Sequence, residues 1–129
     1  MNKSITFLVA DNDTASRLLT EEILRSVFKE DQAIDILSTG NGQDAFELCN
    51  RSEVKLIITD IKLAEINGFE LTKRVKKSFP NIPVIIQTGM ITDDIEKQIY
   101  AYGADAYITK PVNIHLFSKK ITPFLLKLN

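Results

Sequence analysis

Apolar residues in this chain recur with two different periods. Short runs rich in β-branched residues, typical of buried strands, occupy residues 5–10, 33–37, 54–59, 84–88 and 106–109. Between and after them, apolar residues repeat at helical spacing. These sets are Ala15, Leu19, Ile23, Leu24, Val27 and Phe28; Ala45, Leu48 and Cys49; Leu71, Val75 and Phe79; Ile95, Ile99 and Tyr102; and Phe117, Ile121, Phe124, Leu125 and Leu128. The pattern predicts five strands that alternate with five helices.

The alternation also predicts how the strands are joined. A strand that is followed by a helix and then by another strand indicates a parallel α/β sheet with helices on both faces. Right-handed crossovers leave few topologies for such a chain, and we expect the doubly wound, flavodoxin-like strand order 2-1-3-4-5. No linker or internal repeat interrupts the pattern, so we expect a single domain over residues 1–129.

Polar residues with distinct chemistry stand where four of the predicted strands end. Asp11 follows the first strand, Asp60 follows the third, Thr88 ends the fourth and Lys110 follows the fifth. In the expected strand order the chain direction reverses between strands 1 and 3, and ligands of such sheets bind at the carboxyl ends of the strands near that reversal. The sequence therefore predicts that two acids, a hydroxyl and an amine converge at one edge of the sheet.

Composition narrows the classes of partner. The 129 residues are 44% hydrophobic and 26% charged, with a formal net charge of −1. This is an ordinary globular composition, without the positive excess that would attract nucleic acid or a membrane surface. A single cysteine, Cys49, excludes an intramolecular disulfide, and the first apolar run is too short for a signal peptide. We expect a soluble, cytoplasmic protein that binds neither membranes nor nucleic acid.

The four strand-end residues are suited to phosphoryl transfer. Two neighbouring carboxylates repel each other, and a hard divalent cation such as Mg²⁺ allows both to stay ionised. Lys110 and Thr88 could hold the oxygens of a phosphoryl group, and Gly89 leaves room for it. An aspartate can itself be the nucleophile and form an acyl phosphate. The set therefore predicts phosphoryl transfer to or from a carboxylate.

Four segments carry a resemblance to a known family: "FLVADND", "IITDIKLAEINGFEL", "IIQTG" and "GADAYITKP". In this order, they resemble the receiver domain of two-component response regulators, the CheY-like family, over essentially the whole chain. The resemblance implies that Asp60 is the phosphoacceptor. It implies a Mg²⁺ site made of Asp11, Asp60, the backbone carbonyl of Lys62 and the position held by Asn12.

The resemblance also implies a switch. Thr88 and Lys110 would bind the phosphoryl group, and Tyr107 would be the aromatic residue whose rotamer reports phosphorylation, although Tyr107 is equally well explained as an ordinary strand aromatic. The surface formed by the fourth helix, the fifth strand and the fifth helix would then change its partners. The bond between Lys110 and Pro111 is expected to be cis.

Partners follow from the same resemblance. The phosphodonor would be a sensor histidine kinase or a phosphotransfer protein, and the output would pass to an effector protein or to an effector domain absent from this sequence. A homodimer through the last two helices is a further expectation. The protein would not be an enzyme in the usual sense, although it would promote its own phosphorylation and dephosphorylation.

The sequence departs from the family at one important position. The family usually has two adjacent acids after the first strand, and the second acid binds the metal directly. Here that second position is Asn12. An amide brings no charge, so we expect Mg²⁺ to bind more weakly than it does in receivers with both acids. Asp13 is expected to cap the first helix instead. Leu63-Ala64 and Asn67-Gly68 replace the usual Met-Pro and Asp-Gly pairs and keep the apolar contact and the turn.

Two other functions are compatible with parts of the sequence. Asn12 allows a degenerate receiver, which would act as an interaction module without phosphorylation. The segment Asp11-Asn12-Asp13-Thr14 resembles the opening motif of haloacid-dehalogenase-like phosphatases, in which Asp11 would be the nucleophile. Those enzymes need an acidic metal pair after the lysine, and no acidic residue follows Lys110 here. Asp60 would also have no role in such a phosphatase.

The last predicted helix contains a proline. Pro123 lies within the apolar stripe. Its missing N–H and its ring would destabilise a helix interior by about 3 kcal/mol. We therefore expect a kink or a break near Ile121 and Thr122. The apolar residues Phe124, Leu125 and Leu126 beyond that point could then pack on a second copy or lead into another domain.

Overall fold

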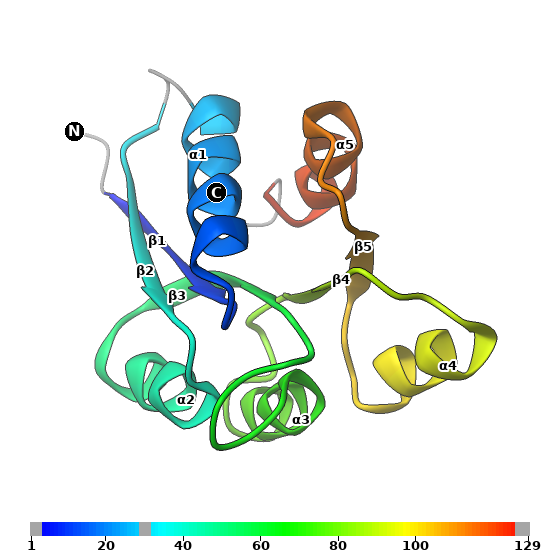
Figure 1. Cartoon of the computed structure of the whole chain (residues 1–129). Helices are drawn as coiled ribbons and strands as arrows, with labels where there is room; N and C mark the ends of the chain where they lie inside the picture. Colours follow the sequence, from blue (N-terminus) through cyan, green and yellow to red (C-terminus); the bar gives the residue numbers. More distant parts are fainter. Residues whose placement is uncertain (1–3, 29–31, 126–129) are drawn as a thin grey trace.

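The centre of the molecule is a parallel sheet. The computed structural model describes residues 4–28 and 32–125 of the chain. In this part of the chain the strands are β1 (Ile5–Ala10), β2 (Ile34–Thr39), β3 (Val54–Thr59), β4 (Val84–Thr88) and β5 (Ala106–Thr109). They lie in the order β2-β1-β3-β4-β5, as predicted. β1 and β3 are paired neighbours, so their carboxyl ends lie side by side (Figure 1).

Helices cover both faces of the sheet. They are α1 (Thr14–Phe28), α2 (Gly42–Arg51), α3 (Gly68–Ser78), α4 (Asp93–Ala101) and α5 (Ile114–Leu125). α1 and α5 lie on one face, and α2, α3 and α4 lie on the other (Figure 1). This is the doubly wound arrangement that the sequence predicted. Within the described ranges, no helix combines the length and apolarity that crossing a bilayer requires.

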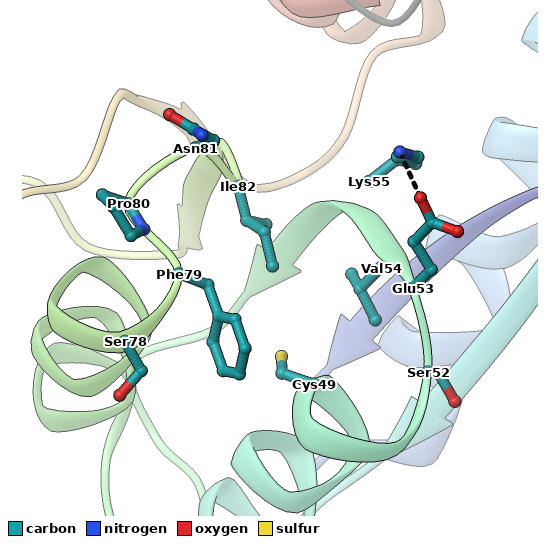
Figure 2. Close-up of a pocket in the computed structure, with 10 residues that line it drawn as sticks. All are labelled: Cys49, Ser52, Glu53, Val54, Lys55, Ser78, Phe79, Pro80, Asn81 and Ile82. Atoms are coloured by element: carbon teal, nitrogen blue, oxygen red, sulfur yellow. Dashed lines mark hydrogen bonds and ion pairs between the residues drawn. The ribbon is translucent and has the colours of Figure 1, made fainter.

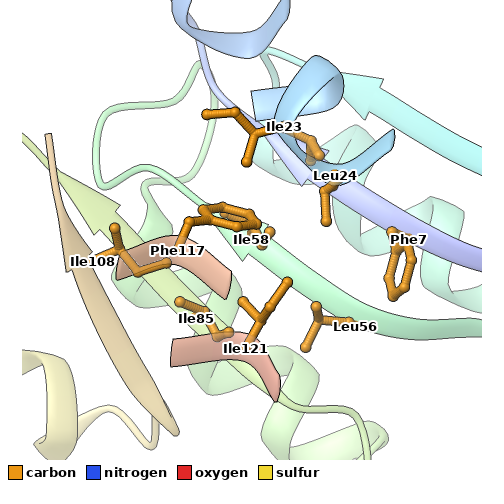
Figure 3. Packing of buried hydrophobic residues seen from close by; sticks show 10 residues of the cluster. Phe7, Ile23, Leu24, Leu56, Ile58, Ile85, Ile108, Phe117 and Ile121 are labelled. Atoms are coloured by element: carbon orange, nitrogen blue, oxygen red, sulfur yellow. The ribbon is translucent and has the colours of Figure 1, made fainter. Parts of the chain in front are cut away.

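The hydrophobic core has a layer on each side of the sheet. Because successive strand residues point to opposite faces, the three central strands β1, β3 and β4 contribute buried residues to both layers. In the layer under α1 and α5, the buried residues are Phe7, Val9, Ile23, Leu24, Leu56, Ile58, Ile85, Ile108, Phe117 and Ile121 (Figure 3). The layer under α2 and α3 contains Leu8, Ala10, Ala45, Cys49, Val54, Ile57, Leu71, Val75 and Val84. The two layers hold the strand ends in fixed relative positions.

Side-chain caps begin several of the helices. A cap satisfies an N–H group of the first turn that has no partner inside the helix. The acceptor and donor residues are Asn41 and Asp44 at α2, Asn67 and Glu70 at α3, and Thr92 and Ile95 at α4. At α1, the Asp13 carboxylate accepts a hydrogen bond from the Ala15 N–H at 3.2 Å, so its predicted capping role is confirmed.

The inward face of α1 differs from the predicted one. Ala15 and Leu19 were expected inside, but both are exposed, and 45% of Leu19 is accessible. Thr20 is fully buried instead. Its hydroxyl donates to the Ser16 carbonyl at 3.1 Å and accepts from the Gln87 amide of β4 at 3.0 Å. A helix advances about 100° per residue, so a repeat of four residues drifts by about 40° at each step, and only the second half of the predicted stripe stays inside.

Of the kink or break predicted in α5, the break is wrong for the described part of the helix, and the kink stays a prediction. The helix runs from Ile114 to Leu125 with Pro123 inside it. Phe117 and Ile121 are fully buried, and Phe124 and Leu125 pack against the same core layer. This packing offsets the loss of one backbone hydrogen bond near the end of the helix. Phe124 and Leu125 are therefore less available to a second copy than the sequence indicated; Leu126 and Leu128 lie outside the described residues.

Candidate functional site

Three strand ends bring opposite charges into contact. Lys110, which follows β5, places its Nζ atom 2.6 Å from Oδ2 of Asp60 and 3.1 Å from Oδ2 of Asp11. Asp11 follows β1 and Asp60 follows β3, so the lysine spans from the edge strand to both acids at the centre of the sheet. The predicted convergence of Asp11, Asp60 and Lys110 is therefore present in the structure.

Asp60 is held from both sides of its carboxylate. Oδ1 accepts the backbone N–H of Ile61 at 2.6 Å, and Oδ2 contacts Lys110. The backbone N–H of Asp60 donates to the Ala10 carbonyl at 2.8 Å, which continues the pairing of β3 with β1. The Asp60 side chain is still 17% exposed. Its carboxylate is thus both fixed in position and accessible to a reactant.

The loop after Asp60 packs closely on the aspartate backbone. The Gly68 N–H donates to the Ile61 carbonyl at 2.7 Å, and a Cβ atom at Gly68 would lie 2.0 Å from the Asp60 carbonyl oxygen. Only glycine allows that approach. The start of α3 therefore rests directly on the backbone of Asp60. The sequence indicated a turn at Asn67-Gly68, but it gave no signal for this contact.

Lys110 remains a cation in this setting. Burial acts against its charge, but the hydrogen bonds and the attraction from Asp60 and Asp11 outweigh burial and raise the Lys110 pKa above its ordinary value. The peptide bond between Lys110 and Pro111 is cis, as the family resemblance implied. The Lys110 N–H donates to the Thr88 carbonyl at 2.8 Å, which joins the ends of β4 and β5.

Asp11 is the more buried of the two acids. It is 3% exposed, and its Oδ1 atom accepts the Asp13 N–H at 2.9 Å. The guanidinium of Arg17, one turn into α1, donates to the Asp11 carbonyl at 2.8 Å. The sequence analysis did not identify Arg17. Its position six residues after Asp11, within the helix that follows, is the only feature of the sequence that could have indicated this contact. A second cation therefore lies close to the acids, although it contacts backbone.

The oxygen atoms at this edge fit Mg²⁺. This ion commonly takes one or two carboxylates and completes its shell with water and phosphate oxygens, and Asp11 and Asp60 supply two carboxylates. Within residues 4–28 and 32–125, no three His, Cys, Asp or Glu side chains are grouped as a metal cluster. Asn12 and Lys62 are exposed residues beside the acids. Metal binding by Asn12 and by the Lys62 carbonyl stays a prediction.

A hollow of about 490 Å³ opens beside Asp60. Its lining residues are Asp13, Asp60, Ile61, Lys62, Thr88, Gly89, Met90, Ile95 and Lys110. A Cβ atom at Gly89 would have no neighbour within 4 Å, so the backbone there faces open space. The Thr88 hydroxyl accepts the Met90 N–H at 3.2 Å and donates to the Met90 carbonyl at 3.1 Å. Thr88 is thus at the hollow as predicted, and its hydroxyl is bonded to the β4–α4 loop.

Tyr107 lies on edge strand β5 and is partly buried. Its hydroxyl donates to Oε2 of Glu96 on α4 at 2.5 Å, and Nζ of Lys120 on α5 lies 5.2 Å from its ring centroid. The hydrogen bond to Glu96, followed by burial, raises the Tyr107 pKa. The sequence reading named Tyr107 but missed Glu96 and Lys120. The switch role of Tyr107 stays a prediction.

A second hollow lies at the opposite edge of the sheet, between the ends of α2 and α3. In Figure 2 the side chains of Cys49, Val54, Phe79 and Ile82 point toward one another, and Lys55 is paired with Glu53 at 2.8 Å. Burial raises the pKa of the Cys49 thiol to about 11, so the thiol is protonated and unreactive near neutral pH. This hollow lacks converging charged groups, unlike the hollow beside Asp60.

Comparison with known proteins identifies the family of the chain. The family model of the response regulator receiver domain matches residues 7–122. The polar-differentiation response regulator DivK of Brucella anthropi is 32% identical over 127 residues, which cover 97% of this chain and 98% of the relative.

Solved structures give the same result for the fold. The response regulator receiver domain protein (CheY-like) of Methanospirillum hungatei JF-1 is 29% identical, with a TM-score of 0.82 and coverage of 97% of this chain and 96% of that one. A two-component response regulator from Clostridium difficile has a TM-score of 0.85 at 21% identity, covers 98% of this chain and 99% of its own, and bears on the fold alone. The chain therefore belongs to the response regulator receiver domain family of two-component signalling proteins.

Proposed function

We propose that this receiver accepts a phosphoryl group on Asp60 from the phosphohistidine of a sensor histidine kinase or a phosphotransfer protein. The observation that carries the proposal is the contact of Lys110 with both Asp60 and Asp11 beside the hollow that holds Thr88 and Gly89. A phosphoryl group entering there would meet a carboxylate nucleophile and a cation. Receiver family membership supports the same assignment.

The proposed step is a displacement at phosphorus. An Asp60 carboxylate oxygen forms a bond to phosphorus, the bond from phosphorus to the donor nitrogen breaks, and the imidazole leaves with the electron pair. Lys110 offsets the charge on the phosphoryl oxygens, and the Thr88 hydroxyl donates to one of them after it leaves Met90. Bound at Asp11 and Asp60, Mg²⁺ would neutralise further charge on the transferring group. Attack of water at phosphorus then breaks the bond to the Asp60 oxygen, which releases inorganic phosphate and restores the carboxylate.

The output of the domain is proposed to be a change in protein contacts. Movement of Thr88 toward the phosphoryl group would favour another position of Tyr107 and alter the surface of α4, β5 and α5. Exposed residues of α4 and of the loop before it, including Tyr100 at 50% and Met90 at 67% accessibility, are available to an effector. Binding of a second copy through α4 and α5 is an alternative use of this surface.

Asp60 should become phosphorylated when the protein is incubated with acetyl phosphate and Mg²⁺. Intact-protein mass spectrometry is expected to detect one added phosphoryl group on the wild type and none on Asp60→Asn or after chelation of the metal. An adduct that persists in Asp60→Asn but disappears in Asp11→Asn would favour the phosphatase alternative. The absence of any adduct, with the protein folded and Mg²⁺ in excess, would instead favour an interaction module that works without phosphorylation.

Replacing Asn12 by aspartate should strengthen Mg²⁺ binding by roughly tenfold or more, because the change adds a charged oxygen ligand beside Asp11. Phosphorylation by acetyl phosphate should then need less Mg²⁺. Calorimetric titration and the phosphorylation rate measure the two effects. Asn81→Asp makes the same charge change at the opposite edge of the sheet and should alter neither. Equal affinities for Asn12→Asp and wild type would show that position 12 does not reach the metal.

A further inference from the structure

The segment from Met90 to Glu96 contacts both residues of the proposed switch. The Thr88 hydroxyl exchanges two hydrogen bonds with the backbone of Met90, and the Tyr107 hydroxyl donates to Glu96. Thr92 lies between these contacts and caps α4 through the Ile95 N–H at 3.2 Å. The β4–α4 loop and the first turn of α4 are therefore bonded to Thr88 on one side and to Tyr107 on the other.

Tyr107 is held in place by charged and aromatic groups from both neighbouring helices. On the α4 side, Glu96 accepts a hydrogen bond from the Tyr107 hydroxyl, and on the α5 side Lys120 lies over the ring. The Tyr100 ring meets it edge-on, with centroids 6.1 Å apart. A hydrogen bond to a carboxylate is stronger than one between neutral groups. These contacts therefore stabilise the ring in this orientation, in addition to its packing at the edge of the sheet.

We propose that Glu96 is a positioning residue that holds Tyr107 in the unphosphorylated arrangement and so sets how readily the receiver switches. This inference rests on the proposed phosphoryl switch at Asp60 and names the residue that opposes it. When Thr88 releases Met90, the segment that carries Glu96 loses a contact on one side. Displacement of that segment weakens the Glu96–Tyr107 bond on the other side, so the two changes favour each other.

Removing the carboxylate should therefore change the position of the Tyr107 ring without any phosphorylation. In Glu96→Ala, the population of the alternative ring position should rise on the order of tenfold, the shift expected when a hydrogen bond to a charged group is lost. Glu96→Gln keeps an acceptor but removes the charge, so its effect should be intermediate. Fluorotyrosine NMR of the unphosphorylated protein reports the ring positions, and Tyr107→Phe identifies the Tyr107 signal among the three tyrosines.

Asp94→Asn is the matched control. It removes one negative charge from the same helix, at an exposed position two residues before Glu96 and so on another face of the helix. Its Tyr107 signal should match that of the wild type. An unchanged signal in a folded Glu96→Ala variant would overturn the proposal, and so would an equal change in Asp94→Asn.

A second measurement separates this proposal from the proposed function. Phosphorylation of Asp60 is scored by mass spectrometry, whereas the ring position is read from unphosphorylated protein. Loss of Glu96 should leave the mass adduct on Asp60 in place and move the Tyr107 signal toward that of the wild type bound to beryllofluoride. A Tyr107 signal that moves away from the beryllofluoride position would refute the inference even if Asp60 is phosphorylated. Should Glu96→Ala fail to fold, Glu96→Gln and its Tyr107 signal decide the question.

Discussion

Lys110→Met should lower the rate of Asp60 phosphorylation by roughly 10²–10³-fold, the usual effect of removing a group that stabilises charge in a transition state. The same change should strengthen Mg²⁺ binding. In the wild type the ammonium lies 2.6 Å from Asp60 and 3.1 Å from Asp11, so it competes with a metal for those carboxylates. The two expected effects have opposite signs: Mg²⁺ binds more tightly while phosphorylation becomes slower. A general disruption of the site would weaken both.

Lys110→Met should also lower the free energy of unfolding, which is a second way to test the ion pairs. Without Lys110, the buried Asp11 and the nearby Asp60 face each other with no counter-charge between them. We expect a loss of about 1–3 kcal/mol, less than for a fully buried pair because the Lys110 side chain is 21% exposed. Added Mg²⁺ should restore more stability to the variant than to the wild type. Lys119→Met, at an exposed position of α5, is the control and should show none of these effects.

The pH dependence of this stability follows from the raised pKa of Lys110. A cation whose pKa is raised by folding stabilises the folded state below its unfolded pKa, and this contribution is lost as the pH rises through the folded value. The difference in unfolding free energy between wild type and Lys110→Met should thus be constant between pH 7 and 9, and it should shrink above the ordinary lysine value of 10.5. A difference that already shrinks from pH 7 to 9 would contradict the ion-pair account.

Gly68→Ala should damage both the fold and the site. Its new Cβ atom would lie 2.0 Å from the Asp60 carbonyl oxygen and 2.9 Å from the Asp60 carbonyl carbon. Backbone must move to relieve such a clash, at a cost of about 1–3 kcal/mol or more. Because the displaced backbone is that of Asp60, the phosphorylation rate should also fall in the protein that remains folded. Urea unfolding and the phosphorylation rate at low temperature measure the two effects.

Gly42→Ala provides a close match for this experiment. Its Cβ atom would lie 2.1 Å from the Ile66 carbonyl oxygen, so the clash is of similar severity but falls on the backbone of Ile66 and not on that of Asp60. Stability should fall by a similar amount in both variants, whereas phosphorylation should suffer mainly in Gly68→Ala. Equal losses of phosphorylation would show that general loosening of the loop, and not the contact with Asp60, limits the reaction.

The sequence predicted the sheet and the charged part of the site because both depend on short-range patterns. Strand residues alternate or run apolar over a few positions, and Asp11, Asp60 and Lys110 each follow such a run directly. Strand order then determines their convergence, and a parallel α/β chain has few available orders. The sequence reading ended β2 at residue 37, and the strand continues through Ser38 and Thr39, since polar residues on an edge strand give no burial signal.

The features that the sequence did not predict depend on the rotation of a helix about its own axis or on contacts between distant residues. Burial of Thr20 depends on the rotation of α1 and on Gln87, 67 residues away. The Glu96–Tyr107 bond depends in the same way on the rotation of α4. Pro123 was predicted to break α5 from local cost alone, but the core contacts of Phe117 and Ile121 outweigh that cost. Such outcomes are set by tertiary packing, which no local pattern records.

The two hydrogen-bonded parts of the site have different consequences for engineering. Asp11, Asp60 and Lys110 follow strands that are bonded to one another, so their geometry is inherited from the sheet. The segment from Met90 to Glu96 is hydrogen-bonded to the side chains of Thr88 and Tyr107, the two residues of the proposed switch, and is otherwise largely exposed. Under the proposed switch, substitutions in α4 are expected to change the sensitivity of a biosensor built on this domain while Asp11, Asp60 and Lys110 stay unchanged. The level of phosphorylation needed for switching and the rate of Asp60 phosphorylation could then be varied separately.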